Sequence, residues 1–354
     1  MTPIPLDPSL DQLRRCTIAV DIGAARTRVY LRNTGLVVDE PSVAAVDIRT
    51  GALIAVGKRA ETMAGRTPDH IRVARPVAGG AVVDIEMAQR MLRHVLGDKL
   101  GRRWQRLSLL RGTPVMRAAV CMPHGSEPVA RRAVVETLYG LGARRVELVD
   151  TLIAAAVGCG LPVEFPEATM VVVCGAGTTQ VAVLSLGSIV AAETVPVGGD
   201  AIDRALVEYL RSRHELMLPS QSVRPLHQVL GATGPGRTAT TRVVGRDVAS
   251  GLARAVTVRT DDVREAMRTP LNMVVDAITS VLRQCAPDLV ADLADRGIML
   301  AGGSARMPGL DTMLREATLM PVHVAPNPDT VAVRGLGAMV EGKVRPMSLI
   351  PLGV

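Results

Sequence analysis

The sequence predicts a two-lobed α/β fold, and three observations carry that prediction. The chain has 354 residues, 48% of them hydrophobic, which is enough for a sizeable core and more than one simple domain usually holds. Strand-like runs are mixed with segments of helical period, as in layered α/β proteins. A buried strand, a glycine-bearing turn and a returning strand occur once in each half of the chain. This weak internal repeat suggests two related domains that face a cleft.

The individual elements follow from apolar periodicity. Strands are expected at Cys16–Asp21, Arg28–Leu31, Gly35–Val38, Thr169–Val173 and Gln180–Leu186. Helices are expected at Ile85–Leu96, Val129–Leu141, Asp200–Arg213, Val263–Leu282 and Leu310–Thr318. The stretch Leu230–Thr241 has the composition of a loop, and Pro326–Asp329 that of a turn.

Composition excludes several classes of protein. No apolar stretch approaches the roughly 20 residues that span a bilayer. The first residues carry prolines and acids where a signal peptide needs a basic start and an apolar run, so we expect a cytoplasmic protein. The five cysteines are scattered without a C-x-x-C pair, which argues against a disulfide framework or a zinc site.

The formal charge of +7 makes anionic partners plausible, among them a membrane surface, nucleic acid and nucleotide. The chain has only one tryptophan, three tyrosines and one phenylalanine. A protein that binds single-stranded nucleic acid stacks bases on aromatic side chains. We therefore expect no nucleic-acid partner.

The first glycine turn, Asp21–Thr27, has the composition of a phosphate-binding loop. Its small residues, Gly23, Ala24 and Ala25, allow backbone N–H groups to approach phosphate closely. Asp21 stands at the end of the strand and could hold Mg²⁺ through water. Taken alone the pattern is weak, because a plain hairpin turn has the same residues.

Four further segments in a fixed order make the interpretation specific. They are Asp150–Gly160, Thr169–Gln180, Gly297–Leu310 and Val331–Gly337. Together with the first turn they resemble the two phosphate loops, two connecting segments and adenosine loop of the actin, Hsp70 and sugar-kinase superfamily. Shorter segments are similar to the MreB family of bacterial actins in particular: Glu40–Val43, Gly65–Pro68, Arg75-Pro76, Arg131–Ala133 and Val197–Asp200.

The resemblance implies an actin-like fold with a central nucleotide cleft and two inserted subdomains. Lobe I would comprise residues 1–150, with an insertion near 45–78, and would be completed by residues 330–354. Lobe II would comprise residues 151–330, with an insertion near 200–260. From the length of the sequence we expect no substrate-binding domain of the Hsp70 kind, and we expect no sugar-binding site of the kinase type.

Departures from the family pattern fall in the cleft. The family glutamate that polarises the attacking water aligns with Thr151, whose hydroxyl is no general base near neutral pH. The aspartate that opens the second phosphate loop aligns with Val173, which offers no oxygen to Mg²⁺ or its water. Ala176 replaces a glycine and disfavours a positive φ, and Gln180 replaces an acid. We assign no catalytic residue and expect hydrolysis to be absent or very weak.

Nucleotide binding is a separate question, because most of the cleft glycines remain. The resemblance places ATP or ADP, with doubtful Mg²⁺ dependence, on Asp21, Gly23, Ala24, Ala25, Arg26, Gly175, Ala176, Gly177, Thr178, Gln228, Gly302, Gly303 and Ser304. Family residues that contact the nucleoside align with Leu226 and Gln228. Arg26 stands where the family has asparagine, and either neutralises phosphate in place of the metal or is solvated at the cleft mouth.

A membrane-binding segment is expected at Leu100–Leu110, which mixes leucines with arginines and holds the tryptophan. It matches the loop that MreB proteins insert into the inner leaflet, with Trp104, Leu107, Leu109 and Leu110 as the inserting residues. The alternative is a helix end packed on the core.

Three functions remain open from the sequence. The first is an MreB-like filament former or filament partner, peripheral on the inner face of the cell membrane and its anionic lipids. It would assemble with itself or a conventional MreB and work with cell-wall elongation or morphogenesis proteins. The second is an active, polymerising ATPase in which other acids replace those lost. The third is a non-polymerising adaptor that docks on a true MreB.

Overall fold

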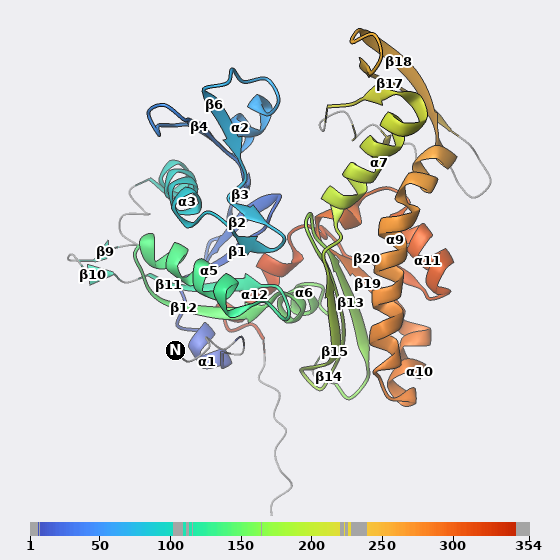
Figure 1. The fold of residues 1–354 in the computed structure, drawn as a ribbon. Helices are drawn as coiled ribbons and strands as arrows, with labels where there is room; N and C mark the ends of the chain where they lie inside the picture. Colours follow the sequence, from blue (N-terminus) through green and yellow to red (C-terminus); the bar gives the residue numbers. More distant parts are fainter. Residues whose placement is uncertain are drawn as a thin grey trace, which may run out of the picture.

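Two five-stranded sheets form the two halves of the molecule and stand side by side (Figure 1). The computed structural model describes residues 6, 8–101, 109–110, 113–114, 116–163, 165–219, 223, 226–227 and 239–344. The first sheet has the order β12-β11-β1-β2-β3 and the second the order β15-β14-β13-β19-β20. In each sheet, three strands pair antiparallel through two hairpins, and two further strands pair in parallel beside the first of them. The same plan therefore occurs twice.

The expected strands are all present, with ends shifted by at most three residues. The first sheet consists of β1 (Ile18–Ile22), β2 (Arg26–Leu31), β3 (Gly35–Pro41), β11 (Met116–Met122) and β12 (Ala143–Asp150). The second consists of β13 (Thr169–Cys174), β14 (Thr179–Ser185), β15 (Ser188–Val195), β19 (Ile298–Ala301) and β20 (Val322–Val324). Every residue of β13 is buried, as expected for an apolar strand that is covered on both faces.

All five expected helices are present, with a sixth, α10. They are α3 (Ile85–Leu100), α5 (Pro128–Gly140), α7 (Gly199–His214), α9 (Thr260–Arg283), α10 (Pro287–Arg296) and α11 (Leu310–Thr318). The first two share an apolar cluster with the first sheet. The other four share a second cluster with the second sheet.

Two apolar helices, α6 (Thr151–Gly158) and α12 (Val331–Val340), lie between the sheets (Figure 1). Their side chains form one cluster with residues of both sheets. The helices cross closely, because a Cβ on Gly158 would lie 1.9 Å from the Val331 carbonyl oxygen. A Cβ on Gly335 would likewise lie 1.9 Å from the Ala154 carbonyl oxygen. Glycine at both positions allows the two backbones to touch.

Smaller elements lie away from the two main sheets. The sheet β5-β4-β6 is formed by Leu53–Val56, Ala44–Asp47 and Ile71–Ala74 beside α2 (Lys58–Met63). The sheet β16-β17-β18 is formed by Leu216–Met217, Thr240–Asp247 and Ala253–Arg259. The remaining elements are α1 (Leu10–Leu13), β7 (Val77–Ala78), β8 (Ala81–Val82), β9 (Leu109–Leu110), β10 (Thr113–Pro114) and the 3₁₀ turn η2 (Gly303–Arg306).

One loop prediction is wrong at its end. Thr240 and Thr241, expected in a loop, begin β17, where they pair with Arg259 and Val258 of β18. Strand pairing, which single-sequence composition does not reveal, decides their conformation.

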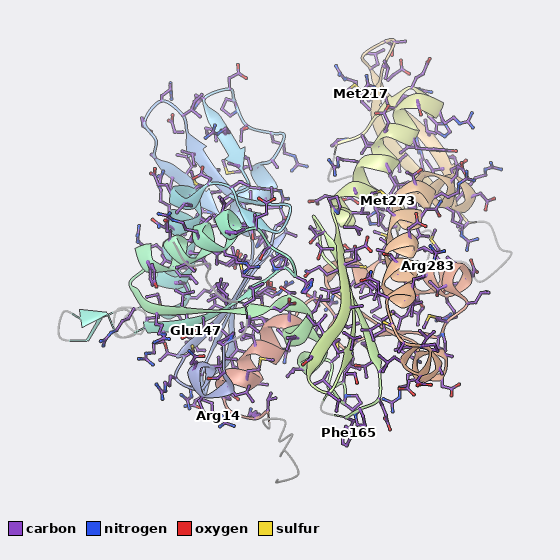
Figure 2. All side chains as sticks on the ribbon, turned by 60° about the horizontal axis from the view of Figure 1, so that its bottom comes forward. Arg14, Glu147, Phe165, Met217, Met273 and Arg283 are labelled. Carbon is purple, nitrogen blue, oxygen red and sulfur yellow. The ribbon has the colours of Figure 1, made fainter. Side chains whose placement is uncertain are left out.

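The second half carries exposed apolar side chains at its two ends. Figure 2 shows Met217 of β16 at one end and Phe165, which precedes β13, at the other; both are exposed. Among the described residues, no helix has the length and apolar character needed to cross a membrane.

Candidate functional site

The first glycine turn joins β1 to β2 through Gly23, Ala24 and Ala25. The Gly23 N–H donates to the Arg26 carbonyl at 3.0 Å, and the Ser42 hydroxyl donates to the Gly23 carbonyl at 2.6 Å. A Cβ on Gly23 would lie 2.8 Å from the Arg26 oxygen, so a side chain would open the turn.

The second glycine turn joins β13 to β14 in the other half. The Gly175 N–H donates to the Thr178 carbonyl at 2.9 Å. The N–H groups of Gly199 and Asp200, at the start of α7, donate to the carbonyls of Gly175 and Ala176. Ala176 is not among the residues with positive φ, so its methyl group causes no backbone strain. The turn is therefore held firmly against the helix start.

The third segment, Gly302–Ser304, packs against the second turn. Gly302 has a φ of 88°, and a Cβ there would lie 2.2 Å from the Cys174 carbonyl oxygen. The Ser304 hydroxyl donates to the Gly175 carbonyl at 2.8 Å. The structure thus brings together two sequence-predicted segments that are far apart in the chain.

The two halves meet across these turns. A Cβ on Gly177 would lie 3.1 Å from the backbone nitrogen of Gly79, in the turn between β7 and β8. Arg75 donates to the Ala24 carbonyl of the first turn at 3.3 Å. Burial raises the pKa of Asp200 and the Arg75 guanidinium opposes that rise, so this arginine also lies near the start of α7.

A network of alternating charges lies beside the first turn. Arg28 of β2 has a side chain only 8% exposed, within 3.7 Å of Asp21, 3.1 Å of Asp39 and 3.5 Å of Asp329. Arg306 of η2 also pairs with Asp329, at 2.6 Å. Burial raises the pKa of Asp21, and Arg28 opposes this rise. The network connects β1 and β2 of the first half with η2 of the second.

Arg26 is engaged by a neighbour on β3. Its Nε donates to Asp39 Oδ1 at 2.6 Å, and a terminal amino group donates to the Asp39 carbonyl at 2.7 Å. The Arg26 side chain is 37% exposed, so this ion pair leaves both proposed roles open, phosphate neutralisation and solvation at the cleft mouth. Arg28, which the sequence reasoning missed, holds the more buried cation. The signal was the Arg-Thr-Arg alternation, which places both arginines on one face of the strand.

A comparison with known sequences identifies the family. The family profile described as "MreB/Mbl protein" matches residues 15–347. The chain belongs to the MreB/Mbl family. It is 37% identical over 329 residues to "Cell shape-determining protein MreB" of Escherichia coli K12, covering 92% of this chain and 93% of that one. It is 35% identical over 326 residues to "Cell shape-determining protein Mbl" of Bacillus subtilis 168, covering 92% and 95%.

Solved structures confirm the expected actin-like fold. MreB5 of Spiroplasma citri bound to AMPPNP superposes with a TM-score of 0.82 at 26% identity, covering 90% of this chain and 93% of that one. The same protein bound to ADP gives the same TM-score. A MamK double helical filament subunit has a TM-score of 0.72 at 18% identity, covering 93% and 99%.

Thr151 and Val173, the positions expected to replace the family's acids, lie at the start of α6 and near the end of β13. Thr151 is the first residue of α6. Val173 is 7% exposed and pairs with Gln180 across the hairpin of β13 and β14. No group of three or more histidine, cysteine, aspartate or glutamate side chains arranged for a metal occurs among the described residues. Asp21, the candidate metal residue, lies 3.7 Å from the Arg28 guanidinium.

His124 lies just past β11 and was missed in the sequence. Its Nδ1 lies 2.7 Å from Asp150 Oδ2, while Asp150 Oδ1 accepts the Leu152 N–H at the start of α6. The His124 N–H donates to Gln180 Oε1 at 2.8 Å, and its carbonyl accepts from Thr194 at 3.1 Å. His124 therefore joins the first half of this family member to two strands of the second.

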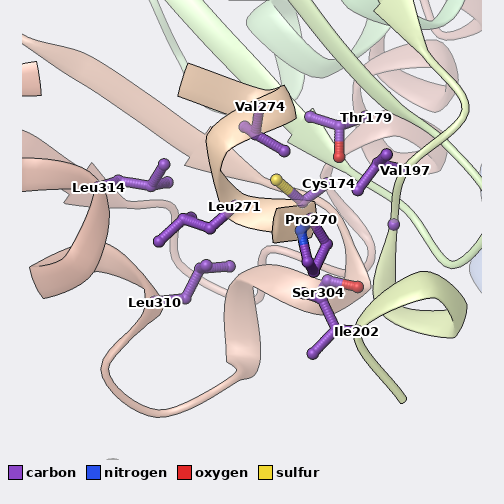
Figure 3. A pocket seen from close by; sticks show the side chains of 11 residues that line it. Cys174, Thr179, Val197, Ile202, Pro270, Leu271, Val274, Ser304, Leu310 and Leu314 are labelled. Carbon is purple, nitrogen blue, oxygen red and sulfur yellow. The ribbon is translucent and has the colours of Figure 1, made fainter. Parts of the chain in front are cut away.

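A small apolar pocket lies behind the second turn, between α7, α9 and α11 (Figure 3). Cys174, Ile202, Leu271 and Leu310 contribute apolar walls, and Ser304 is one of its few polar side chains. The pocket lacks the donors that a phosphate needs.

Several predicted site residues lie outside the described part of the chain. These are Gln228 and the membrane-binding candidates Trp104 and Leu107. Leu109 and Leu110 form the short strand β9, of which only the backbone is described. Leu226 is fully buried in the apolar cluster of the second half.

Proposed function

We propose that this MreB/Mbl family member is a cell shape-determining cytoskeletal protein that binds ATP or ADP between its two halves. It hydrolyses ATP inefficiently at neutral pH. It works as a filament former, or as the partner of one, at the inner face of the cell membrane. The observation that carries the proposal is the convergence of glycine turns from both halves, through Gly177, Gly79 and Ser304, on one region.

Binding is supported by the backbone of the turns. Glycine and alanine leave N–H groups open to close approach, and phosphate binds such groups well. The nucleotide would lie on the first turn, the Gly175–Thr178 turn and the Gly302–Ser304 segment, with the nucleoside near Gln228. The relative MreB5 of Spiroplasma citri has been solved with AMPPNP and with ADP, which adds to this support.

Slow hydrolysis is supported by the side chains at two positions. Thr151 supplies a hydroxyl where a carboxylate would orient the attacking water, and Val173 supplies no oxygen to a metal-bound water. Arg28 places a buried guanidinium 3.7 Å from Asp21, in the place where a cation would otherwise balance that carboxylate. We therefore expect nucleotide binding to depend little on Mg²⁺.

Assembly is supported by the ends of the second half. Met217 and Phe165 are exposed at opposite ends (Figure 2), and a head-to-tail contact between copies, which does not close into a ring, would bury both. The solved MamK filament has the same fold. The net charge of +7 suits a membrane surface of anionic lipid.

A calorimetric titration with ATP, in Mg²⁺ and again in EDTA, tests the proposal. We expect saturable binding in both, with dissociation constants within about tenfold of each other, because the fixed arginine replaces part of the metal's charge. Binding that disappears in EDTA contradicts the Mg²⁺ part of the proposal. The absence of binding in both conditions contradicts the nucleotide site itself.

A further inference from the structure

The pair His124 and Asp150 is built like the base and orienting acid of a hydrolase. Asp150 is 4% exposed and fixed at the start of α6 by the Leu152 N–H. Its second oxygen holds Nδ1 of His124 at 2.7 Å, which sets the ring orientation and leaves Nε2 as the proton acceptor. No hydrogen bond to Nε2 is formed within the described ranges of the chain. A carboxylate that fixes a histidine in this way prepares it to take a proton.

The pair lies at the edge of the sheet where the first turn begins. The parallel strands β1, β11 and β12 end at Ile22, Met122 and Asp150, so their carboxyl ends share one edge. The carboxylates of Asp21 and Asp150 both act on the thiol of Cys121, whose pKa burial already raises. Asp150 therefore lies close to the first turn in space, and ligands of open α/β sheets bind at this edge.

The backbone of His124 also contacts the second half of the molecule, close to the second turn. Gln180, which accepts the His124 N–H, is two residues past Thr178 at the end of that turn. A Cβ on Gly80 would lie 2.9 Å from the Pro123 ring and 3.8 Å from the Thr178 methyl group. His124 is thus held between the two turns that would carry the phosphates.

We propose that His124, held by Asp150, is the general base for the water that attacks the terminal phosphate of a nucleoside triphosphate in this cleft. The inference rests on the nucleotide binding proposed above. In this proposal the slow hydrolysis that remains is catalysed by His124, because Thr151 occupies the position of the family's acid.

The step balances without a further reactant. The water oxygen forms a bond to the terminal phosphorus, and the bond from that phosphorus to the bridging oxygen breaks with its electron pair on the nucleoside diphosphate. One water proton passes to Nε2 of His124 and is later released to solvent, and the other stays on the phosphate. Asp150 stays ionised and acts as a positioning residue that stabilises the imidazolium.

The charged surroundings of the ring set the pH range of this step. Its hydrogen bond with Asp150 raises the pKa of His124, while partial burial and the Arg131 guanidinium of α5 oppose the rise. Gln180, from β14, is neutral. Because the base form dominates only above this raised pKa, turnover rises as the pH increases toward the alkaline range.

Phosphate release by the full chain from pH 6 to 9 tests the inference. We expect the wild-type rate to rise with pH, and His124→Asn, which keeps a donor toward Asp150, to lose about 100-fold and the rise with pH. His94→Asn, on the exposed face of α3, is the matched control and should match the wild type. Calorimetry with AMPPNP should give equal binding for all three proteins.

A second readout does not depend on turnover. The ring proton resonance of His124 reports its pKa by NMR, and we expect AMPPNP to raise that pKa more than ADP does, because the terminal phosphate adds negative charge nearby. Asp150→Asn keeps the helix cap and should lower both the pKa and the pH at which phosphate release rises.

Three results would overturn the inference. One is a His124→Asn rate and pH profile equal to the wild type. Another is an equal effect of AMPPNP and ADP on the ring. The third is ATP binding without phosphate release at any pH, which would leave the proposed nucleotide site intact. Failure to bind ATP would instead contradict both the proposed nucleotide site and this inference.

Discussion

Arg28 shows how one buried side chain can set the charge balance of a cleft. Its guanidinium is nearly buried and has three carboxylates around it, from β1, β3 and the turn after β20. Removing the cation would leave those carboxylates to repel one another in a poorly solvated place. Buried ion pairs contribute modestly as a whole, but the loss of one partner is costly.

Arg28→Met is therefore expected to lower the free energy of unfolding by about 3–5 kcal/mol, measured by urea denaturation. Arg72→Met, at an exposed position on β6, is the control and should change it by less than about 0.5 kcal/mol. Equal effects of the two substitutions would contradict the role of the buried network.

His124 gives the fold a pH dependence with a definite sign. Because its pKa is raised in the folded protein, mainly by the hydrogen bond to Asp150, the protonated ring stabilises the fold. That contribution is fully present below the ordinary histidine pKa of about 6.5 and is lost as the pH rises through the folded value. The unfolding free energies of wild type and His124→Asn should differ most near pH 6 and converge at alkaline pH. A difference that grows with pH would contradict this assignment.

At the scale of elements, the crossing of α6 and α12 depends on glycine. Gly335→Ala would place a methyl group against the Ala154 carbonyl oxygen, only 1.9 Å from the ideal Cβ position, in a helix pair packed between two sheets. We expect a loss of about 2–3 kcal/mol in thermal or urea unfolding, as in overpacked cores.

Gly97→Ala in α3 is the matched control for that substitution. Nothing lies within 4 Å of a Cβ built on Gly97, so the alanine should stabilise the helix by up to about 1 kcal/mol. If both substitutions have the same sign, the close crossing is not what limits position 335.

Periodicity predicted most elements because it is a local property. The helix expected at Leu310–Thr318 has those same ends. The helix α6 was not predicted, since its sequence is apolar throughout and shows no amphipathic period. Its place between two sheets explains that pattern, because a helix buried on all sides needs no polar face.

The sequence alone could predict the backbone turns of the candidate site but not its side-chain pairs. The glycine turns are visible in the sequence because glycine and alanine mark tight turns. Side-chain pairs are not visible, because Arg28 and Asp329 are 301 residues apart and His124 and Asp150 are 26 apart. For this reason the sequence directed attention to Arg26, which Asp39 holds, rather than to Arg28.

At the scale of the whole molecule, the net charge of +7 predicts electrostatic binding to membranes that contain anionic lipid. It should sediment with vesicles that contain anionic lipid and remain in solution with zwitterionic vesicles. Binding should weaken as salt rises, because the Debye length falls from about 10 Å at 0.1 M to about 3 Å at 1 M. Equal binding to both kinds of vesicle would contradict an electrostatic attachment.

The arrangement of two similar halves around shared helices suits a protein in which the bound nucleotide controls how the halves sit together. In this chain the contacts between the halves include the hydrogen bond from the His124 backbone N–H to Gln180 and that from the Thr194 hydroxyl to the His124 carbonyl. A bound nucleotide that is slowly hydrolysed would hold the halves in one state for long periods.

The identity of the bound nucleotide tests this account most directly. The purified chain is mixed with ATP at pH 7, separated from free nucleotide after several minutes, and the released nucleotide is resolved by chromatography. We expect mostly intact ATP, with and without Mg²⁺. Recovery of mainly ADP, or of no nucleotide, would contradict it.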